Sequence, residues 1–206
     1  TRAYPDHGIL AEESGMKEGG EYTWVIDPLD GTTNFLHGFP VFCISVAVMK
    51  GDAVHHGVVY DPVRDEMFTA SRGDGAQLNG KKIRVSKTRQ LAPALLGTGF
   101  PFREMDNLTP WLRSFEYLLP KTAGIRRAGA AALDLAYVAA GRLDGFWEFG
   151  LKPWDIAAGA LLIREAGGLI AEFSGGQDFI AKGNVVAGNP LILEELRKVV
   201  YRTTAG

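Results

Sequence analysis

The residues best suited to chemistry stand in the string WVIDPLDGTTNF, residues 24–35. Asp27 ends an apolar run, Asp30 follows three residues later, and Gly31 permits a sharp turn. Two carboxylates held a few ångströms apart repel each other, and a bridging divalent cation relieves that repulsion. Mg²⁺ is a hard cation that takes oxygen ligands, including a backbone carbonyl such as that of Leu29. The string therefore predicts a metal site.

The same string offers a place for a phosphate group. Thr32, Thr33 and Asn34 favour the start of a short helix, where the N–H groups of Gly31 and Thr32 suit a phosphate oxygen. Carboxylates, a cation and N–H groups at one point indicate phosphate-ester chemistry. Asp-Pro and Asp-Gly are also ordinary turn dipeptides, and for either alone we would favour that simpler interpretation. The whole string after a buried strand favours the chemical one.

Other candidate residues are weaker when each is taken alone. Glu12 and Glu13 form an acidic pair of the kind that a solvated loop carries. Asp155 stands at a helix start, where a carboxylate caps backbone N–H groups. Glu148 lies on a strand among aromatic residues, either on its polar face or as a ligand for a substrate hydroxyl.

Several further side chains have two interpretations or only a structural one. Arg126 and Arg127 either bind phosphate or face solvent. The glycine-containing helix starts RRAGAAALD and WDIAAGA each present N–H groups to a small polar ligand. The four histidines show no metal-ligand spacing, and Cys43 in its apolar run is expected in the core.

The elements that must position these residues follow from hydrophobic patterning. Residues 41–86 are typical of an antiparallel meander, and Asn79-Gly80 predicts a hairpin turn within it. Other predicted strands are YTWVID, AGIRRAG, RLDGFWEFG, LIAEF and NVVAGN. Predicted helices are NLTPWLRSFEYLL (capped by Asn107 or Thr109), AAALDLAYVAAG, WDIAAGALLIREAGG and PLILEELRKVV. Strands that alternate with helices after an all-β stretch predict a layered α/β architecture with mixed sheets.

Composition sets outer bounds on the function. The chain has 206 residues, 46% of them apolar and 22% charged, with a net charge of −2. That size suits a single domain, 1–206, with a metal-site and antiparallel-sheet half (1–90) and an α/β half (91–206). The chain lacks the excess of Lys and Arg residues that would indicate nucleic-acid binding. A single cysteine suits a reducing cytosol, and the run 39–49 is too short to span a membrane. We therefore expect a cytoplasmic protein.

Three strings together resemble one family. WVIDPLDGTTNF, the upstream EES and the downstream PWDIAAGALLIREAGG are similar to the inositol monophosphatase family, and GIRRAGAAALDLAYVAAGRLDGFWEFGLKPWD is most similar to its bacterial SuhB-type members. The resemblance runs from about Gly8 to the C-terminus. It implies an αβαβα sandwich, related to fructose-1,6-bisphosphatase, and Mg²⁺-dependent hydrolysis of phosphate monoesters with two or three ions. It also implies a lithium-sensitive enzyme that acts on inositol 1-phosphate, and a homodimer.

The resemblance implies a role for nine residues. Metal ligands would be Glu12, Asp27, Asp30, Asp155 and the carbonyl of Leu29. Gly31 and Thr32 would form the phosphate-binding turn, with Thr32 also orienting the attacking water. Ala131 and Glu148 would contact the inositol ring, and Asp30 and Asp155 would also face the substrate.

The chain departs from the family pattern at its N-terminus. It begins with Thr1, and TRAYPDHGILAEESG is typical of the middle of a protein. The family normally has two N-terminal helices before this point, and a segment with a lysine, a threonine and aspartates that position water and a further metal. We therefore expect the segment to be missing from the chain or from the protein.

Three alternatives stay open. A haloacid-dehalogenase-type enzyme has Asp-x-Asp-Gly-Thr, whereas this chain has Asp-x-x-Asp-Gly-Thr, which would misalign a nucleophile and its acid partner. SuhB-type members are associated with transcription antitermination, which implies a protein that binds RNA polymerase or its elongation factors. Related phosphatases act on fructose 1,6-bisphosphate, histidinol phosphate or phosphoadenosine phosphate.

Overall fold

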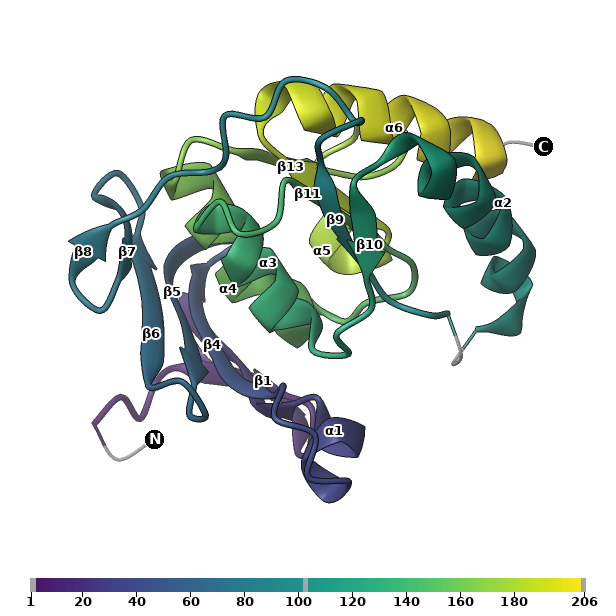
Figure 1. Ribbon diagram of the computed structural model, residues 1–206. Coiled ribbons are helices and arrows are strands. Elements are labelled where there is room, and N and C mark those ends of the chain that lie inside the picture. The colour runs from purple at the N-terminus through teal and green to yellow at the C-terminus, as the bar shows by residue number, and fades with distance from the viewer. Residues whose placement is uncertain (1–2, 102–103, 205–206) are drawn as a thin grey trace.

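Two β-sheets and the helices packed on them make up the computed structural model, which describes residues 3–101 and 104–204 (Figure 1). The eight strands of the first sheet, in spatial order, are β2 (Gly15–Lys17), β1 (Gly8–Ala11), β3 (Tyr22–Asp30), β4 (Cys43–Lys50), β5 (Ala53–Asp61), β6 (Glu66–Ser71), β7 (Gly75–Leu78) and β8 (Lys81–Lys82). All neighbours pair antiparallel except β1 and β3, which are parallel.

The second sheet is mixed. Its strands, in spatial order, are β10 (Gly124–Arg126), β9 (Leu95–Thr98), β11 (Gly145–Glu148), β13 (Val185–Gly188) and β12 (Leu169–Ala171). The first three are parallel, whereas β13 runs antiparallel to both of its neighbours. The mixed sheets and the meander predicted for 41–86 are confirmed by this topology.

The helices complete the layers. They are α1 (Thr32–Leu36), α2 (Leu108–Leu118), α3 (Ala131–Ala139), α4 (Pro153–Glu165), α5 (Phe179–Lys182) and α6 (Pro190–Thr204), with 3₁₀ turns at Met105–Asn107 and Leu119–Lys121. Figure 1 shows α3 and α4 between the two sheets, and α2 and α6 on the far face of the five-stranded sheet. The order sheet, helices, sheet, helices confirms the layered α/β fold expected from the sequence.

The central helix pair is buried on nearly all sides because a sheet covers it on each face. In α4 every residue from Ile156 to Ile163 is buried. Small residues let the helices approach closely: a methyl group added to Gly159 would lie 2.5 Å from Cβ of Leu135 in α3. The core between the sheets is therefore specified by small and aliphatic side chains, and it holds α3 and α4 rigidly beneath the cleft described below.

Local signals predicted most element ends. Gly141 and Gly167, with φ of 70° and 87°, follow α3 and α4 as expected for left-handed helix ends. Asn79 and Gly80 also have positive φ, as the hairpin requires. Of the two predicted caps, Asn107 is the N-cap residue of α2, whereas Thr109 lies inside the helix. The Asn107 side chain makes no capping hydrogen bond to the helix, and its amide instead donates to the Glu104 carboxylate at 2.9 Å.

The strands β1, β2 and β9 and the helix α5 were not anticipated from the sequence. Each is four residues or shorter, and so short a segment carries little periodicity. Among residues 3–101 and 104–204, the structure contains no helix with both the length and the apolar character needed to cross a bilayer.

Candidate active site

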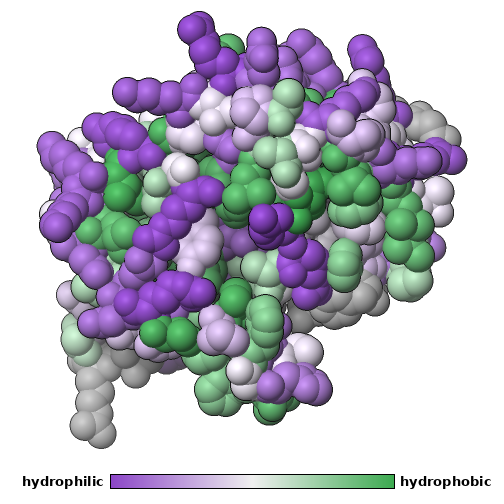
Figure 2. Space-filling view, in the orientation of Figure 1, coloured by the Kyte–Doolittle hydropathy of each residue, from purple (hydrophilic) through white to green (hydrophobic). Residues whose placement is uncertain are grey.

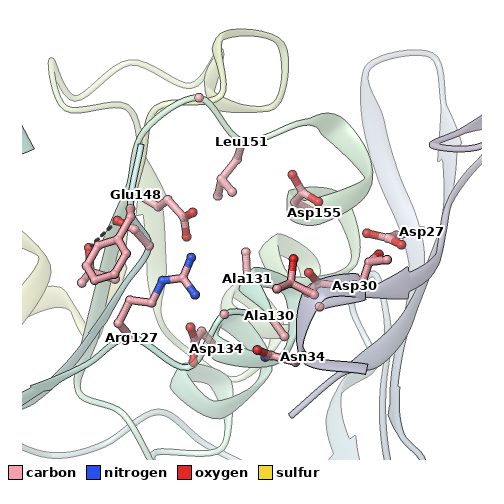
Figure 3. A pocket seen from close by; sticks show the side chains of 18 of the residues that line it. Asp27, Asp30, Asn34, Arg127, Ala130, Ala131, Asp134, Glu148, Leu151 and Asp155 are labelled. Atoms are coloured by element: carbon pink, nitrogen blue, oxygen red, sulfur yellow. Dashed lines mark hydrogen bonds between the residues drawn. The ribbon is translucent and has the colours of Figure 1, made fainter. Parts of the chain in front are cut away.

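Three carboxylates from two distant parts of the chain meet at one point. Asp27 and Asp30 come from the end of β3 and Asp155 from the first turn of α4, and one oxygen of each lies within 4.8 Å of the others. Residues three apart on a regular strand point to opposite faces. Here the pairing of β3 with β4 shifts register between Asp27 and Asp30, so both carboxylates turn to the same side. The gathering is shown in Figure 3.

Hydrogen bonds hold each of these carboxylates in place. Asp27 accepts from the N–H of Leu29 at 2.9 Å, within the turn. Asp30 accepts from the N–H of Ala132 at 2.7 Å, which ties β3 to the first turn of α3. Asp155 accepts from the N–H of Lys152 at 2.7 Å. Asp155 therefore caps its helix, as the simpler interpretation holds, and also lies in the acidic cluster.

The cluster is electrostatically strained without a cation. Burial, together with the nearby Glu12 and Asp155 carboxylates, raises the pKa of Asp27 to about 7. Burial, with Asp155 and Asp27 as charged neighbours, raises the pKa of Asp30 to about 8. Both side chains are nearly inaccessible to solvent. Because the ionised forms are penalised by burial and by one another, a bound divalent cation would stabilise them.

Glu12 joins the cluster through the parallel strand pair. Ala11 lies opposite Ile26, and the N–H of Glu12 donates to the Ile26 carbonyl at 3.2 Å. That register places the Glu12 carboxylate beside Asp27, whereas Glu13 is exposed. The two adjacent acids are therefore not equivalent: one lines the cleft and the other is solvated.

The turn after β3 needs a glycine. Gly31 has φ of 91°, and a methyl group there would lie 2.9 Å from the Val41 carbonyl oxygen. The helix α1 then begins at Thr32, as expected, and the Thr32 hydroxyl donates to the Leu29 carbonyl at 3.0 Å. The predicted ligand carbonyl and the predicted water-orienting hydroxyl are thus in contact.

All nine candidate residues line a single cleft of about 370 Å³. Ala131 starts α3, and Glu148 ends β11 on the wall across from the acidic cluster (Figure 3). Burial raises the pKa of Glu148 well above its usual range, and nearby Asp134 and Asp155 add to this. A methyl group on Gly99 would overlap the Glu148 carboxylate, so the glycine makes room for this side chain.

Among the other residues that line the cleft, Asp134 and Asn34 were not predicted as functional, and Arg127 was left with two interpretations. Asp134 is buried in the first turn of α3, and burial followed by the charge of Asp30 raises its pKa well above the usual range. A lone carboxylate in the apolar string AAALDLAYVAA was the available signal. Asn34 bridges the cleft rim by donating to the Val41 and Ala128 carbonyls at 2.7 and 2.9 Å. Arg127, unlike Arg126, lines the cleft.

Cys43 is fully buried, as expected, and also touches the site. Its thiol donates to Asp30 at 3.7 Å. Burial, followed by the charge of Asp30, raises the pKa of the thiol well above its usual range. Cys43 is therefore a neutral neighbour of the acidic cluster.

Comparisons with known proteins agree with the resemblance seen in the sequence. The model of the inositol monophosphatase family matches residues 1–204. A protein named Nus factor SuhB in Pseudomonas aeruginosa is 60% identical over 194 residues, which is 91% of this chain and 72% of that protein. The Nus factor SuhB of Escherichia coli K12 is 52% identical, over 95% of this chain and 74% of that protein.

Solved structures of the same group share the fold. The extragenic suppressor protein suhB of Bartonella henselae superposes with a TM-score of 0.93 at 45% identity, over 97% of this chain and 77% of that one. An inositol monophosphatase from Anabaena gives 0.92 at 44% identity, over 98% and 81%. The two sheets, the central helix pair and the sequence match thus agree: this chain, which has a phosphatase fold, belongs to the inositol monophosphatase family.

Proposed function

We propose that this protein is a Mg²⁺-dependent phosphate monoester hydrolase that acts on inositol 1-phosphate. The observation that carries the proposal is the cluster of Asp27, Asp30 and Asp155 within 4.8 Å, with Glu12 beside it. Carboxylates and a backbone carbonyl, here that of Leu29, are the ligands that Mg²⁺ prefers. The donor set fits the ion chemically, and its raised pKa values are those of a site built to be neutralised by cations. We propose two or three ions.

The reaction would be an attack by water on phosphorus. When bound, the ions would lower the pKa of water and neutralise charge on the phosphoryl and leaving oxygens. The Thr32 hydroxyl, held against the Leu29 carbonyl, would orient the water. The N–H groups of Gly31 and Thr32 would bind a phosphoryl oxygen. Ala131 and Glu148, across the cleft, would contact the leaving alcohol.

Phosphate release tests the proposal directly. We expect this chain to release phosphate from myo-inositol 1-phosphate with Mg²⁺, and to lose that release when a chelator is added. A longer protein that also carries the N-terminal segment expected from the family resemblance serves as the matched comparison. Release by neither protein would contradict the proposal. Greater release from fructose 1,6-bisphosphate, histidinol phosphate or phosphoadenosine phosphate would correct the substrate.

The names of the relatives favour a second function. Proteins at 52–60% identity are named Nus factor SuhB, a name that refers to transcription. We propose that this chain also binds RNA polymerase or its elongation factors. A pull-down of these proteins with the purified chain tests this function separately from hydrolysis. The two roles are compatible, because the acidic cluster lies inside a cleft and leaves most of the surface for protein contacts.

We also propose a homodimer. Phe35, Leu36 and Phe39 are 51%, 76% and 52% exposed, and they lie on and just after α1, whose first residues line the cleft. Figure 2 shows hydrophobic side chains gathered at the lower end of the molecule, where Figure 1 places α1. Adjacent exposed aromatic and aliphatic side chains mark an association surface. Light scattering should give twice the chain mass of 22.3 kDa, and a monomer mass would contradict the proposal.

A further inference from the structure

A second group of charges lies across the cleft from the acidic cluster. Figure 3 shows the guanidinium of Arg127 pointing into the cleft between the carboxylates of Glu148 and Asp134. None of these three residues belongs to the proposed metal ligands. Asp134 is only 3% exposed, and Glu148 is partly exposed toward the cleft. Two carboxylates and one guanidinium therefore lie together on this wall. The proposed reaction uses Glu148 to contact the leaving alcohol, but it gives Arg127 and Asp134 no role.

The position of Arg127 is built into the fold. It directly follows β10, and its guanidinium carbon lies 4.7 Å from the centre of the Phe100 ring. The next carbonyl along the chain, that of Ala128, accepts from the Asn34 amide at 2.9 Å. Gly129 has φ of 90°, which favours glycine, and a methyl group there would lie 2.7 Å from an Arg127 nitrogen and displace the guanidinium from this position. These neighbours hold the Arg127 side chain in the orientation that points into the cleft.

The charges on this wall depend on one another. Burial raises the pKa of Asp134 and of Glu148, and the Asp134 charge raises that of Glu148 further. The Arg127 charge lowers the pKa of both carboxyl groups. A guanidinium offers only hydrogen-bond donors and a carboxylate only acceptors. Side by side in a cleft, they match two neighbouring hydroxyl groups, one of which accepts from the guanidinium while the other donates to the carboxylate.

We propose that Arg127 binds substrate and determines specificity, by donating to a leaving-group hydroxyl adjacent to the one that Glu148 holds, and that Asp134 positions the Arg127 guanidinium. This inference rests on the proposed hydrolase function and narrows its substrates to monophosphates of neutral polyols with neighbouring hydroxyls. A second phosphate is disfavoured, because the one guanidinium on this wall already lies between two carboxyl groups.

The test compares two phosphate esters that share the reacting phosphate. myo-Inositol 1-phosphate presents ring hydroxyls, whereas p-nitrophenyl phosphate presents none. For Arg127→Ala with Mg²⁺, loss of one charge-assisted hydrogen bond should lower kcat/KM for the inositol ester about 10- to 100-fold, mainly through KM. kcat/KM for p-nitrophenyl phosphate should stay within about twofold, because no hydroxyl meets Arg127. Arg127→Lys should fall between, since it keeps the charge but loses the planar fork.

Two further variants separate binding from structure. Arg113→Ala removes an exposed arginine of α2 outside the cleft and should leave both esters unchanged. Asp134→Asn should raise KM for the inositol ester severalfold in the unmodified chain and add nothing in the Arg127→Ala background, because Asp134 acts through Arg127. Equal losses on both esters, or no loss on either, would overturn the inference. Absence of metal-dependent release by the unmodified chain would instead overturn the proposed function itself.

Discussion

Mg²⁺-dependent phosphate release should fall about a thousandfold or more in Asp27→Asn and in Asp30→Asn, since transition-state charge stabilisation by a metal is worth several kcal/mol. An amide keeps the shape of the side chain but removes its negative charge. Asp27 and Asp30 are buried within the acidic cluster, so no solvent-exposed carboxylate can take their place. Initial rates of phosphate release at saturating Mg²⁺ measure the effect. Asp52→Asn, in an exposed hairpin turn, is the matched control and should retain full activity.

The same substitutions should not unfold the protein. Asp30 accepts from the Ala132 N–H, and an asparagine oxygen can accept that bond as well. Removal of one charge also relieves the repulsion with Asp155 and Asp27. We therefore expect the metal-free Asp30→Asn protein to melt at the same or a higher temperature than the unmodified chain at pH 8. An active variant would contradict the metal-ligand role, whereas an unfolded one would contradict this interpretation of the repulsion.

The stability of the metal-free protein should fall as the pH rises. The pKa of Asp27 is raised from 3.8 to about 7 and that of Asp30 from 3.8 to about 8. At a pH between the unfolded-state and folded-state pKa of each group, the folded chain binds more protons than the unfolded chain. The free energy of unfolding therefore decreases as the pH rises through that range. A pKa that differs by one between the folded and unfolded chains corresponds to about 1.4 kcal/mol, so the total change between pH 4 and pH 8.5 amounts to several kcal/mol. The decrease should level off above about pH 9, one unit above the pKa of Asp30.

Mg²⁺ should reverse this loss. The ion binds the ionised carboxylates of the folded state, so its stabilising effect should be small near pH 5 and largest near pH 8.5. Melting temperatures measured across that range, with Mg²⁺ and with a chelator, test both statements. The double variant Asp27→Asn with Asp30→Asn should show little of the Mg²⁺ effect. Its metal-free stability should depend less on pH than that of the unmodified chain, with the remaining dependence due to buried groups such as Asp134 and Glu148. A metal-free melting temperature that rises with pH, or a Mg²⁺ effect on it that does not vary with pH, would contradict the assignment of these groups.

The sequence by itself determined the part of the site that is local. The string around Asp27 and Asp30 contains its own strand, its own turn and its own helix start, and the glycine at 31 is required by a backbone angle within that string. The helix ends at Gly141 and Gly167 are likewise set within a few residues. The family resemblance rests on these same short strings. Local conformational preference acts over such distances, and therefore neighbouring residues suffice to predict it.

Only the tertiary structure decided which distant residues complete the cleft. Glu12 became distinct from Glu13 through the parallel register of β1 on β3. Asp30 meets α3 through a hydrogen bond between residues 102 apart in the sequence. The sequence left two interpretations for Arg127, phosphate binding or exposure to solvent. The fold places its guanidinium between two carboxylates (Figure 3). Strand register and helix packing depend on burial of a shared core between two sheets, and no short segment contains that information.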